Sequence, residues 1–236
     1  MTNQCYDQAR YRLAGDCGLL VEYGEGIAPD VNAKVRAMAA IVAGEAFDGV
    51  RECIPTYRSL LLVYDPAVTD PAALTARLEA LESQWTAIDI PQPVTVEIPV
   101  CYGGDYGPDI ETVAGSSGIS VADVIRLHSE TLYAIYMIGF TPGFPFLGGL
   151  PPALHTPRLK TPRTHVPMGS VGIANDQTGI YPVASPGGWQ LIGRTPLRLF
   201  RPEAQMPFLY RTGDRIRFVP ITPEHYAELA DRERGA

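Results

Sequence analysis

The sequence predicts an α+β protein, in which a small α/β unit precedes a larger unit built of short β-strands. The first ninety residues alternate apolar runs of strand length with two segments whose apolar residues recur at helical spacing. From about residue 133 to 220, many short β-like runs are separated by turn residues, which favours a β-barrel or a β-sandwich. With 236 residues, 46% of them apolar, the chain is long enough for two domains of ordinary size.

The N-terminal unit is expected to open with a strand and a helix. The run GLLVEYG, residues 18–24, is apolar and ends at a glycine, so it predicts a strand. Residues 28–45 predict a helix, with Asp30 as its N-cap and Gly44 at its end. Four apolar side chains share one face of this helix: Val31, Val35, Met38 and Val42.

Two strands and a second helix follow. GVRECIPTYRSLLLVYDP predicts two strands around Pro55, the second being the strongest strand signal in the chain. In DPAALTARLEALESQW, Asp70 is the expected N-cap and Pro71 the first helical residue. The predicted order is therefore β-α-β-β-α, and VTVEIPV at residues 94–100 could close the unit with a final strand.

A domain boundary is expected near residue 91. The stretch DIPQPVTVE places two prolines between a predicted helix and a predicted strand, which is typical of a connecting segment. Residues 1–90 are therefore assigned to the α/β domain and residues 91–236 to the β-rich domain.

The second domain is expected to contain one helix before its strands. Ser120 can cap this helix in SVADVIRLHSE, with Asp123 in the capping-box position. From about Tyr133 the residues favour a strand, and SVGIA, TGIYPV, WQLIG, LRLF and DRIRFVP predict further strands. The last residues, TPEHYAELADRERGA, predict a short polar helix and a tail.

Charge is distributed unevenly. The net charge of −7 argues against a general nucleic-acid-binding protein. Residues 155–220, in contrast, hold nine basic and three acidic side chains. Such a cationic region suits a small anionic substrate bearing a carboxylate or a phosphate, although it could also be a solvated face that pairs with acids elsewhere. The nine cations are Arg158, Lys160, Arg163, Arg194, Arg198, Arg201, Arg211, Arg215 and Arg217.

Composition also bears on location and metal binding. No run approaches the roughly 18 apolar residues of a membrane span, and no apolar segment follows the N-terminal charges. We therefore expect no membrane segment, no signal peptide and a cytoplasmic protein. The four cysteines form no CxxC pair, so reduced and mostly buried thiols are expected, with no metal site and no disulfide framework.

Residues 139–196 are rich in glycine and proline. Ten of each occur among these 58 residues, yet the stretch also holds many large apolar side chains and does not repeat. This composition predicts rigid, ordered loops, because proline fixes φ and glycine lets the backbone approach closely. The densest part, SPGGWQLIGRTP at residues 185–196, adds a tryptophan and an arginine.

This segment is expected to form one wall of a binding site. The N–H groups of Gly187 and Gly188 could point at an anion or a developing oxyanion. Trp189 would then wall the pocket, and Arg194 would anchor charge. The loop GFTPGFPF, which includes Phe140, is expected to be the facing wall. The alternative is a tight turn before a strand, with Trp189 in the core.

Long motifs carry a specific family resemblance. GFTPGFPFLGGLP, TPRTHVPMGSVGIANDQTGIYPVASPGGWQLIGRTP and the upstream GDYGPD resemble the family of B-type subunits of 5-oxoprolinase. GDCGLLVEYG and YRSLLLVYDP fit the same pattern, so the resemblance covers nearly the whole chain. The family also includes KipI, an inhibitor of a sporulation kinase, and allophanate hydrolase subunit one, and it forms part of urea carboxylase.

The resemblance implies a fold, partners and a cofactor. The fold is a cyclophilin-like β-barrel after a smaller α/β domain. The implied partner resembles allophanate hydrolase subunit two, and in an oxoprolinase a LamB/YcsF-type subunit joins the complex. ATP is implied by the resemblance alone, because the sequence contains no G-x-x-x-x-G-K-[ST] motif and no complete dinucleotide fingerprint.

Two residues are candidates for catalysis. His128 shares a helical face with Val124 and Leu132, which by itself favours a core histidine. A histidine at this place belongs to the family pattern, which implies a general acid or base, or a hydrogen-bond donor to a substrate carbonyl. Arg163 lies between two prolines in TPRTHVP and could bind a carboxylate or phosphate, with a surface salt bridge as the alternative.

Two polar residues in VPMGSVGIANDQTGIYP are candidate substrate-binding groups. Ser170 is interpreted as a hydrogen-bonding group, because its context is M-G-S-V-G and not the G-x-S-x-G of a nucleophile. Gln177 is interpreted in the same way. The segment QTGIYP could instead be only a hairpin turn with Gly179 at its tip.

The resemblance implies one component of an ATP-dependent 5-oxoprolinase, a hydrolase that opens the lactam of 5-oxoproline to L-glutamate together with partner subunits, and the cationic region at residues 155–220 is compatible with it. Phosphorylation of the amide oxygen would make this unstrained amide easier to open, and the chemistry needs cations on phosphate and carboxylate. Two alternatives stay open: a KipI-like binding protein that inhibits a histidine kinase, and a carboxylase or allophanate-type amide hydrolase subunit that acts on urea derivatives.

Overall fold

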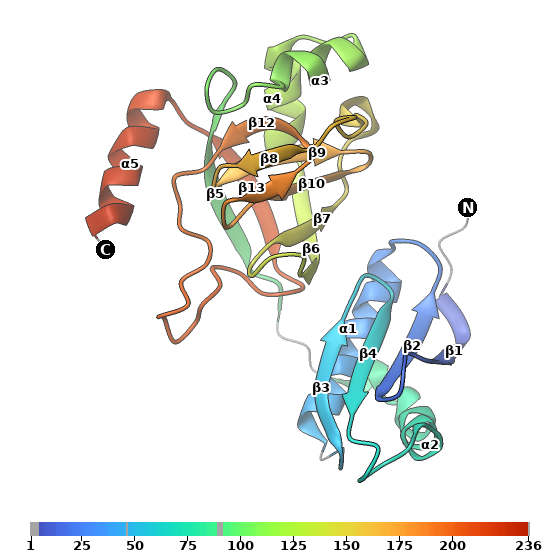
Figure 1. Ribbon diagram of the computed structural model, residues 1–236. Helices are drawn as coiled ribbons and strands as arrows, with labels where there is room; N and C mark the ends of the chain where they lie inside the picture. Colours follow the sequence, from blue (N-terminus) through green and yellow to red (C-terminus); the bar gives the residue numbers. More distant parts are fainter. Residues whose placement is uncertain (1–4, 46, 89–91, 236) are drawn as a thin grey trace. The chain divides into compact units, whose positions relative to one another are not determined.

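The computed structural model describes residues 5–45, 47–88 and 92–235. The chain divides into two compact units, Met1–Gln92 and Pro93–Ala236 (Figure 1). Each unit has its own hydrophobic core. The first unit is a four-stranded sheet with helices, and the second is a closed barrel. The α+β class predicted from the sequence is therefore confirmed.

The sheet of the first unit is antiparallel throughout. Its strand order is β1 (Cys5–Leu13), β2 (Gly18–Gly24), β4 (Ser59–Tyr64) and β3 (Val50–Pro55). The three strands predicted from the sequence are present. Strand β1 was not predicted, because its sequence CYDQARYRL is polar and charged and most of its residues are not buried.

Two helices bury the apolar face of this sheet. Helix α1 spans Pro29–Gly44, and its N-cap residue is Ala28. The prediction of Asp30 as N-cap is wrong, because Pro29 occupies the first helical position and places Asp30 within the first turn. Helix α2 spans Pro71–Glu82, and the carboxylate of its N-cap, Asp70, accepts a hydrogen bond from the Ala73 N–H, as predicted. The core includes Val31, Val35, Met38, Val42, Leu60, Leu62, Leu74 and Leu78.

The second unit is a closed seven-stranded barrel. The order around it is β10 (Gln177–Ile180), β7 (Pro145–Gly148), β6 (Leu132–Ile138), β13 (Arg215–Pro220), β5 (Thr95–Tyr102), β12 (Gln190–Arg194) and β9 (Ser170–Ala174). Strands β5 and β13 pair in parallel, and the other neighbours are antiparallel.

Two strand assignments made from the sequence are wrong. Residues 94–100 do not close the N-terminal sheet, because they fall largely within β5 and pair with β12 and β13 of the barrel. The run LRLF forms no strand: only Phe200 makes an isolated bridge, with Phe208. Strand pairing over a long sequence separation decides both cases, and local composition does not reveal it.

A small two-stranded sheet lies beside the barrel strands. It joins β8 (Arg163–Val166) and β11 (Ser185–Gly187). The hairpin expected at QTGIYP turns earlier in the chain, because Ala174 pairs with Gln177 and Asn175 has a φ of 54°. Gly179 therefore lies within β10, opposite Gly172, and not at a tip.

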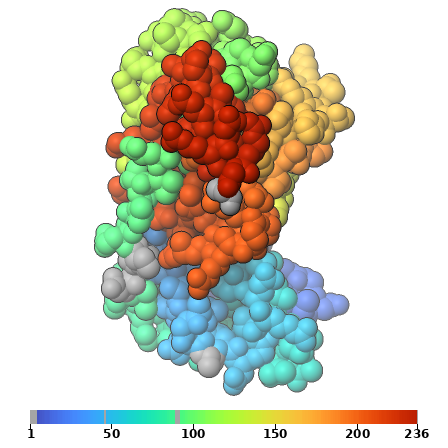
Figure 2. All heavy atoms as spheres, turned by 90° about the vertical axis from the view of Figure 1, so that its left-hand side faces the viewer, coloured from blue at the N-terminus to red at the C-terminus, as the bar shows by residue number. Residues whose placement is uncertain are grey.

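Three α-helices and a short 3₁₀-helix, Pro152–Leu154, complete the described part of the second unit. Helices α3 (Ile110–Ser117) and α4 (Val121–Glu130) pack against each other and against strands β12 and β13. The Ser120 hydroxyl accepts the Asp123 N–H, which confirms the predicted cap of α4. Figure 2 shows α5 (Pro223–Gly235) on the outer surface of this unit, where Glu233 pairs with Arg201.

Two expectations about composition can be compared with the structure. Among the described residues, no helix has the length and apolarity needed to cross a membrane. All four cysteines are free, but the expectation that most are buried is wrong. Cys101 is buried and Cys17 is exposed, whereas Cys5 and Cys53 are half-buried.

Candidate functional site

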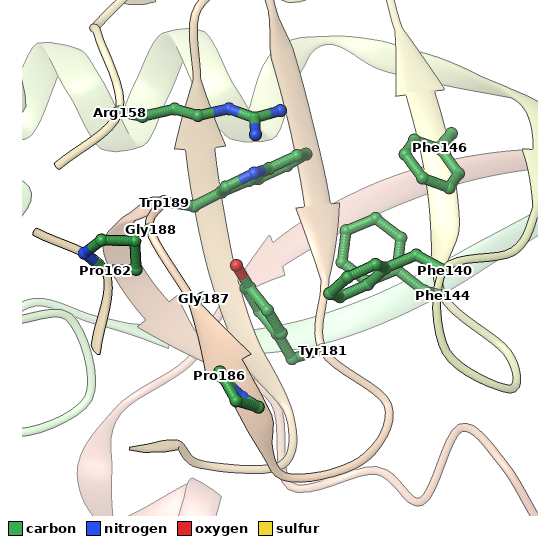
Figure 3. A pocket seen from close by; sticks show the side chains of 10 residues that line it. All are labelled: Phe140, Phe144, Phe146, Arg158, Pro162, Tyr181, Pro186, Gly187, Gly188 and Trp189. Carbon is green, nitrogen blue, oxygen red and sulfur yellow. The ribbon is translucent and has the colours of Figure 1, made fainter. Parts of the chain in front are cut away.

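A cavity of about 500 Å³ lies in the second unit, among the glycine- and proline-rich segments. Its size is typical of small-molecule sites, as is its mainly apolar lining. We call it the aromatic pocket, and Figure 3 shows the side chains around it. It is lined by Phe140, Phe144, Phe146, Arg158, Pro162, Tyr181, Pro186, Gly187, Gly188 and Trp189.

Three packed rings form the inner part of the aromatic pocket. Phe144 meets Trp189 and Tyr181 edge-on, with ring centroids 5.5 and 5.4 Å apart. Trp189 and Tyr181 are also edge-on, at 6.3 Å. Edge-to-face pairs of this kind are favourable beyond their buried area. Because each ring holds the other two, the apolar surface of the pocket is rigid.

Close approach at Gly187 shapes the pocket near Tyr181. A Cβ atom at position 187 would lie 2.5 Å from the Tyr181 hydroxyl oxygen, so a larger residue would fit only if the Tyr181 ring moved. Burial raises the pKa of the Tyr181 hydroxyl, while the backbone of Trp189 and the positive charges of Arg158 and Arg163 act in the opposite direction. The hydroxyl is therefore protonated and lies in a positive potential.

Arg158 is the charged residue of the pocket lining. The Leu159 N–H donates to the Gly188 carbonyl at 2.7 Å, and the Gln190 Nε2 donates to the Pro157 carbonyl at 3.0 Å. These bonds hold the backbone on both sides of Arg158. Its guanidinium carbon lies 6.0 Å from the centre of the Trp189 ring. Sequence reasoning named Arg158 only as one of nine cations and missed its place in the site.

The structure brings together four of the predicted site residues. Phe140, Gly187, Gly188 and Trp189 all line the aromatic pocket, so the two glycine-rich loops do face one cavity. Trp189 is also largely buried, which means that it belongs both to the core and to the pocket wall. Phe140 is 68% exposed and has a φ of 64°, an uncommon conformation for a residue with a large side chain.

Arg163 does not line the aromatic pocket. Its Nη2 donates to Asp109 Oδ1 at 2.7 Å, and its Nη1 donates to the Trp189 carbonyl at 3.3 Å. Asp109 Oδ2 in turn accepts the Leu191 N–H at 2.6 Å. The guanidinium is therefore occupied within the protein, in a half-buried ion pair that holds the segment around Trp189.

His128 lies in the barrel core and does not line the pocket. It is fully buried, and its ring stacks on Phe218 at 4.4 Å. Its Nε2 lies 2.9 Å from Thr178 Oγ1, whose proton is donated to the Gly172 carbonyl. Nε2 therefore carries the ring proton, and Nδ1 accepts the Tyr102 hydroxyl at 2.8 Å. This geometry favours the core alternative, and a catalytic role stays a prediction from the resemblance.

The other three predicted residues lie away from the pocket lining. Ser170 is fully buried in β9, and Gln177 is half-buried in β10. Arg194 reaches the Asp105 carbonyl at 3.4 Å and lies over the Tyr106 ring. Their roles in substrate binding stay predictions that the cavity itself does not support.

The cationic region at residues 155–220 is partly neutralised by ion pairs. Four of its cations pair with carboxylates in the described part of the chain: Arg163 with Asp109, Arg198 with Glu203, Arg201 with Glu233 and Arg217 with Glu97. The alternative of a face that pairs with acids elsewhere therefore accounts for these four. It does not account for Arg158, for which the described residues provide no ion-pair partner.

The fold and the pocket define an α+β protein in which a closed barrel carries a rigid aromatic cavity. The chain belongs to the family described as carboxyltransferase domain, subdomain C and D, whose model matches residues 9–210. It is 44% identical to the B-type subunit of 5-oxoprolinase from Bacillus subtilis (strain 168), covering 92% of this chain and 95% of the relative. It is 41% identical to the corresponding 5-oxoprolinase component of Escherichia coli O157:H7, with 90% and 96% covered.

Solved structures also resemble this chain. A conserved uncharacterized protein from Pyrococcus horikoshii is 42% identical and superposes with a TM-score of 0.55, covering 92% of this chain and 100% of that one. The Kluyveromyces lactis urea carboxylase is 24% identical with a TM-score of 0.77. This match covers 95% of the present chain but 23% of the urea carboxylase, and it concerns the fold alone.

Proposed function

We propose that this chain is the B-type subunit of an ATP-dependent 5-oxoprolinase and helps to open 5-oxoproline to L-glutamate. The observation that carries the proposal is the 44% identity to a 5-oxoprolinase component of the same type, across nearly the full length of both chains. The aromatic pocket supports a small-molecule-binding role for the barrel, because it combines an apolar lining with one cation.

The residues of the pocket do not fit a magnesium-bound triphosphate. Arg158 is the one cation among the lining residues. In the part of the chain that the structure describes, no group of three or more His, Cys, Asp or Glu side chains could hold a metal ion. A nucleotide triphosphate needs several positive groups or backbone donors. We therefore derive no phosphoryl-transfer step through the aromatic pocket, and ATP bound at a subunit interface or on another subunit is what the resemblance implies.

The partners that the resemblance implies are an allophanate-hydrolase-subunit-two-like protein and a LamB/YcsF-type protein. We propose an equimolar complex with the first of these, with activity confined to the full assembly. The test is ATP-dependent glutamate formation from 5-oxoproline by co-purified subunits. The matched control is the same preparation without this chain, which should form no glutamate. Two species that elute separately at micromolar concentration would contradict the complex.

A second candidate is a role in urea chemistry. It is favoured by the family description and by 28% identity to the urea amidolyase of Lachancea kluyveri over 95% of this chain, although this chain covers only 14% of that protein. The same preparation distinguishes the two functions. ATP consumption that depends on urea and bicarbonate, and not on 5-oxoproline, would favour the role in urea chemistry.

A further inference from the structure

We propose that the aromatic pocket is the subsite for the lactam ring and carboxylate of 5-oxoproline. In this assignment the methylene edge of the ring packs on Phe144 and Trp189, and the carboxylate binds the Arg158 guanidinium. The proposal rests on the proposed function and deepens it by naming the part of the substrate that each side of the pocket recognises.

The position of Arg158 carries the charge assignment. Its neighbours Pro157 and Leu159 are hydrogen-bonded to Gln190 and Gly188, so the backbone is fixed at the pocket rim. The guanidinium lies over Trp189, which restricts it further. Within the described residues it has no carboxylate partner. An unpaired guanidinium on a fixed backbone beside an apolar cavity is suited to a ligand that carries its own carboxylate.

The aromatic surface selects the rest of the ligand. Phe144, Tyr181 and Trp189 hold one another edge-on and are nearly fully buried, so they form a preorganised apolar surface. A small ring with methylene groups removes apolar area from water when it packs there. The open-chain product glutamate would bring an ammonium and a second carboxylate against the same rings, which is unfavourable because both charges lose hydration there.

The Tyr181 hydroxyl is a neutral polar group of the lining. Figure 3 shows its oxygen directed toward Gly187 and the Trp189 side of the pocket. Gly187 keeps the space around this oxygen free of a side chain, since a Cβ there would lie 2.5 Å away. The hydroxyl is protonated, so it can donate a hydrogen bond to the lactam carbonyl. A cation for the carboxylate and a neutral donor for the amide match the two polar ends of 5-oxoproline.

The test compares two ligands on the assembled complex without ATP, by isothermal titration. The ligands are 5-oxoproline and its carboxamide, 5-oxoprolinamide, which keeps the ring and loses the charge. Arg158→Gln should weaken 5-oxoproline binding about tenfold and the carboxamide by less than about twofold. The matched control is Lys160→Gln, which removes an equal charge two residues away, outside the pocket lining, and should change both affinities by less than about twofold.

Tyr181→Phe provides a second, independent measurement. It should weaken both ligands by a similar factor, about threefold to tenfold, because both carry the lactam carbonyl. The proposal is overturned if Arg158→Gln binds 5-oxoproline as the wild type does, or if it loses equal affinity for both ligands. It is also overturned if the complex binds no 5-oxoproline.

Steady-state kinetics separate this proposal from the proposed function. If the complex forms glutamate and Arg158→Gln leaves the KM for 5-oxoproline unchanged, the pocket assignment is wrong and the function stands. If the complex forms no glutamate but binds 5-oxoproline in an Arg158-dependent way, the pocket assignment stands and the function is wrong. The thermal midpoint of Arg158→Gln should match the wild type, because its exposed side chain makes no ion pair within the described residues.

Discussion

The Asp109 carboxylate binds the Arg163 guanidinium with one oxygen, at 2.7 Å, and the Leu191 N–H with the other, at 2.6 Å. Because Arg163 also donates to the Trp189 carbonyl, this pair holds the backbone on both sides of Gln190. The GDYGPD and TPRTHVP motifs, distant in sequence, thus meet to fix the wall of the aromatic pocket. Arg163 acts here as a positioning residue.

Arg163→Gln should therefore destabilise the second unit. Asp109 is buried and Arg163 is half-buried, and the variant leaves the Asp109 carboxylate without its cation, at a cost of about 2–3 kcal/mol in the free energy of unfolding. Thermal and urea unfolding measure this loss. Arg217→Gln is the matched control, because Arg217 pairs with Glu97 at 3.6 Å on the surface and should contribute less than about 1 kcal/mol. Equal, small losses in both variants would contradict the assigned role.

His128→Gln should lose stability and keep turnover. The wild-type imidazole uses both ring nitrogens in hydrogen bonds to Tyr102 and Thr178 and stacks on Phe218, so the variant should lose about 1–3 kcal/mol. Turnover per folded complex should stay near the wild-type value. His225→Gln, at an exposed site on α5, serves as the control and should leave the midpoint unchanged. A loss of turnover of about 10²-fold or more without destabilisation would instead establish the catalytic role that the resemblance implies.

The stability of the wild type should depend on pH through His128. Burial lowers the pKa of His128 from 6.5 to about 3. Between these values the unfolded chain binds a proton that the folded protein does not. The free energy of unfolding therefore falls as the pH is lowered through this window, by up to about 1.4 kcal/mol per pH unit. Urea unfolding from pH 7 to 4 should show a smaller decline in His128→Gln than in the wild type, and parallel curves would contradict this prediction.

Phe140→Gly should stabilise the backbone and impair ligand binding. Phe140 adopts a φ of 64°, which costs about 1–2 kcal/mol for a non-glycine residue. Glycine removes this strain, although its greater freedom in the unfolded chain offsets part of the gain. The thermal midpoint should not fall, whereas the KM for 5-oxoproline should rise because one wall of the pocket is lost. Phe140→Ala, which keeps the strain and also removes the ring, separates the two effects.

Local sequence was sufficient to predict most of the helices and strands. Proline at the first helical position and an aspartate before it defined the start of α2, and the serine cap defined the start of α4. Apolar runs located the inner strands of the first sheet. These signals act within a few residues, so they can be interpreted without the rest of the fold. Strand β1 was missed, since its pairing with β2, and not its polar sequence, makes it a strand.

The sequence by itself determined that two glycine- and proline-rich loops face each other, and Phe140, Gly187, Gly188 and Trp189 do line one cavity. Only the tertiary structure decided which cation lies in the lining of this cavity. Arg158 and Arg163 look alike in the sequence, but Arg163 meets Asp109, 54 positions away, and is neutralised, whereas Arg158 is held at the rim without a carboxylate partner among the described residues. Whether a charge is available to a ligand depends on what lies within a few ångströms of it, and contacts between distant segments set that environment.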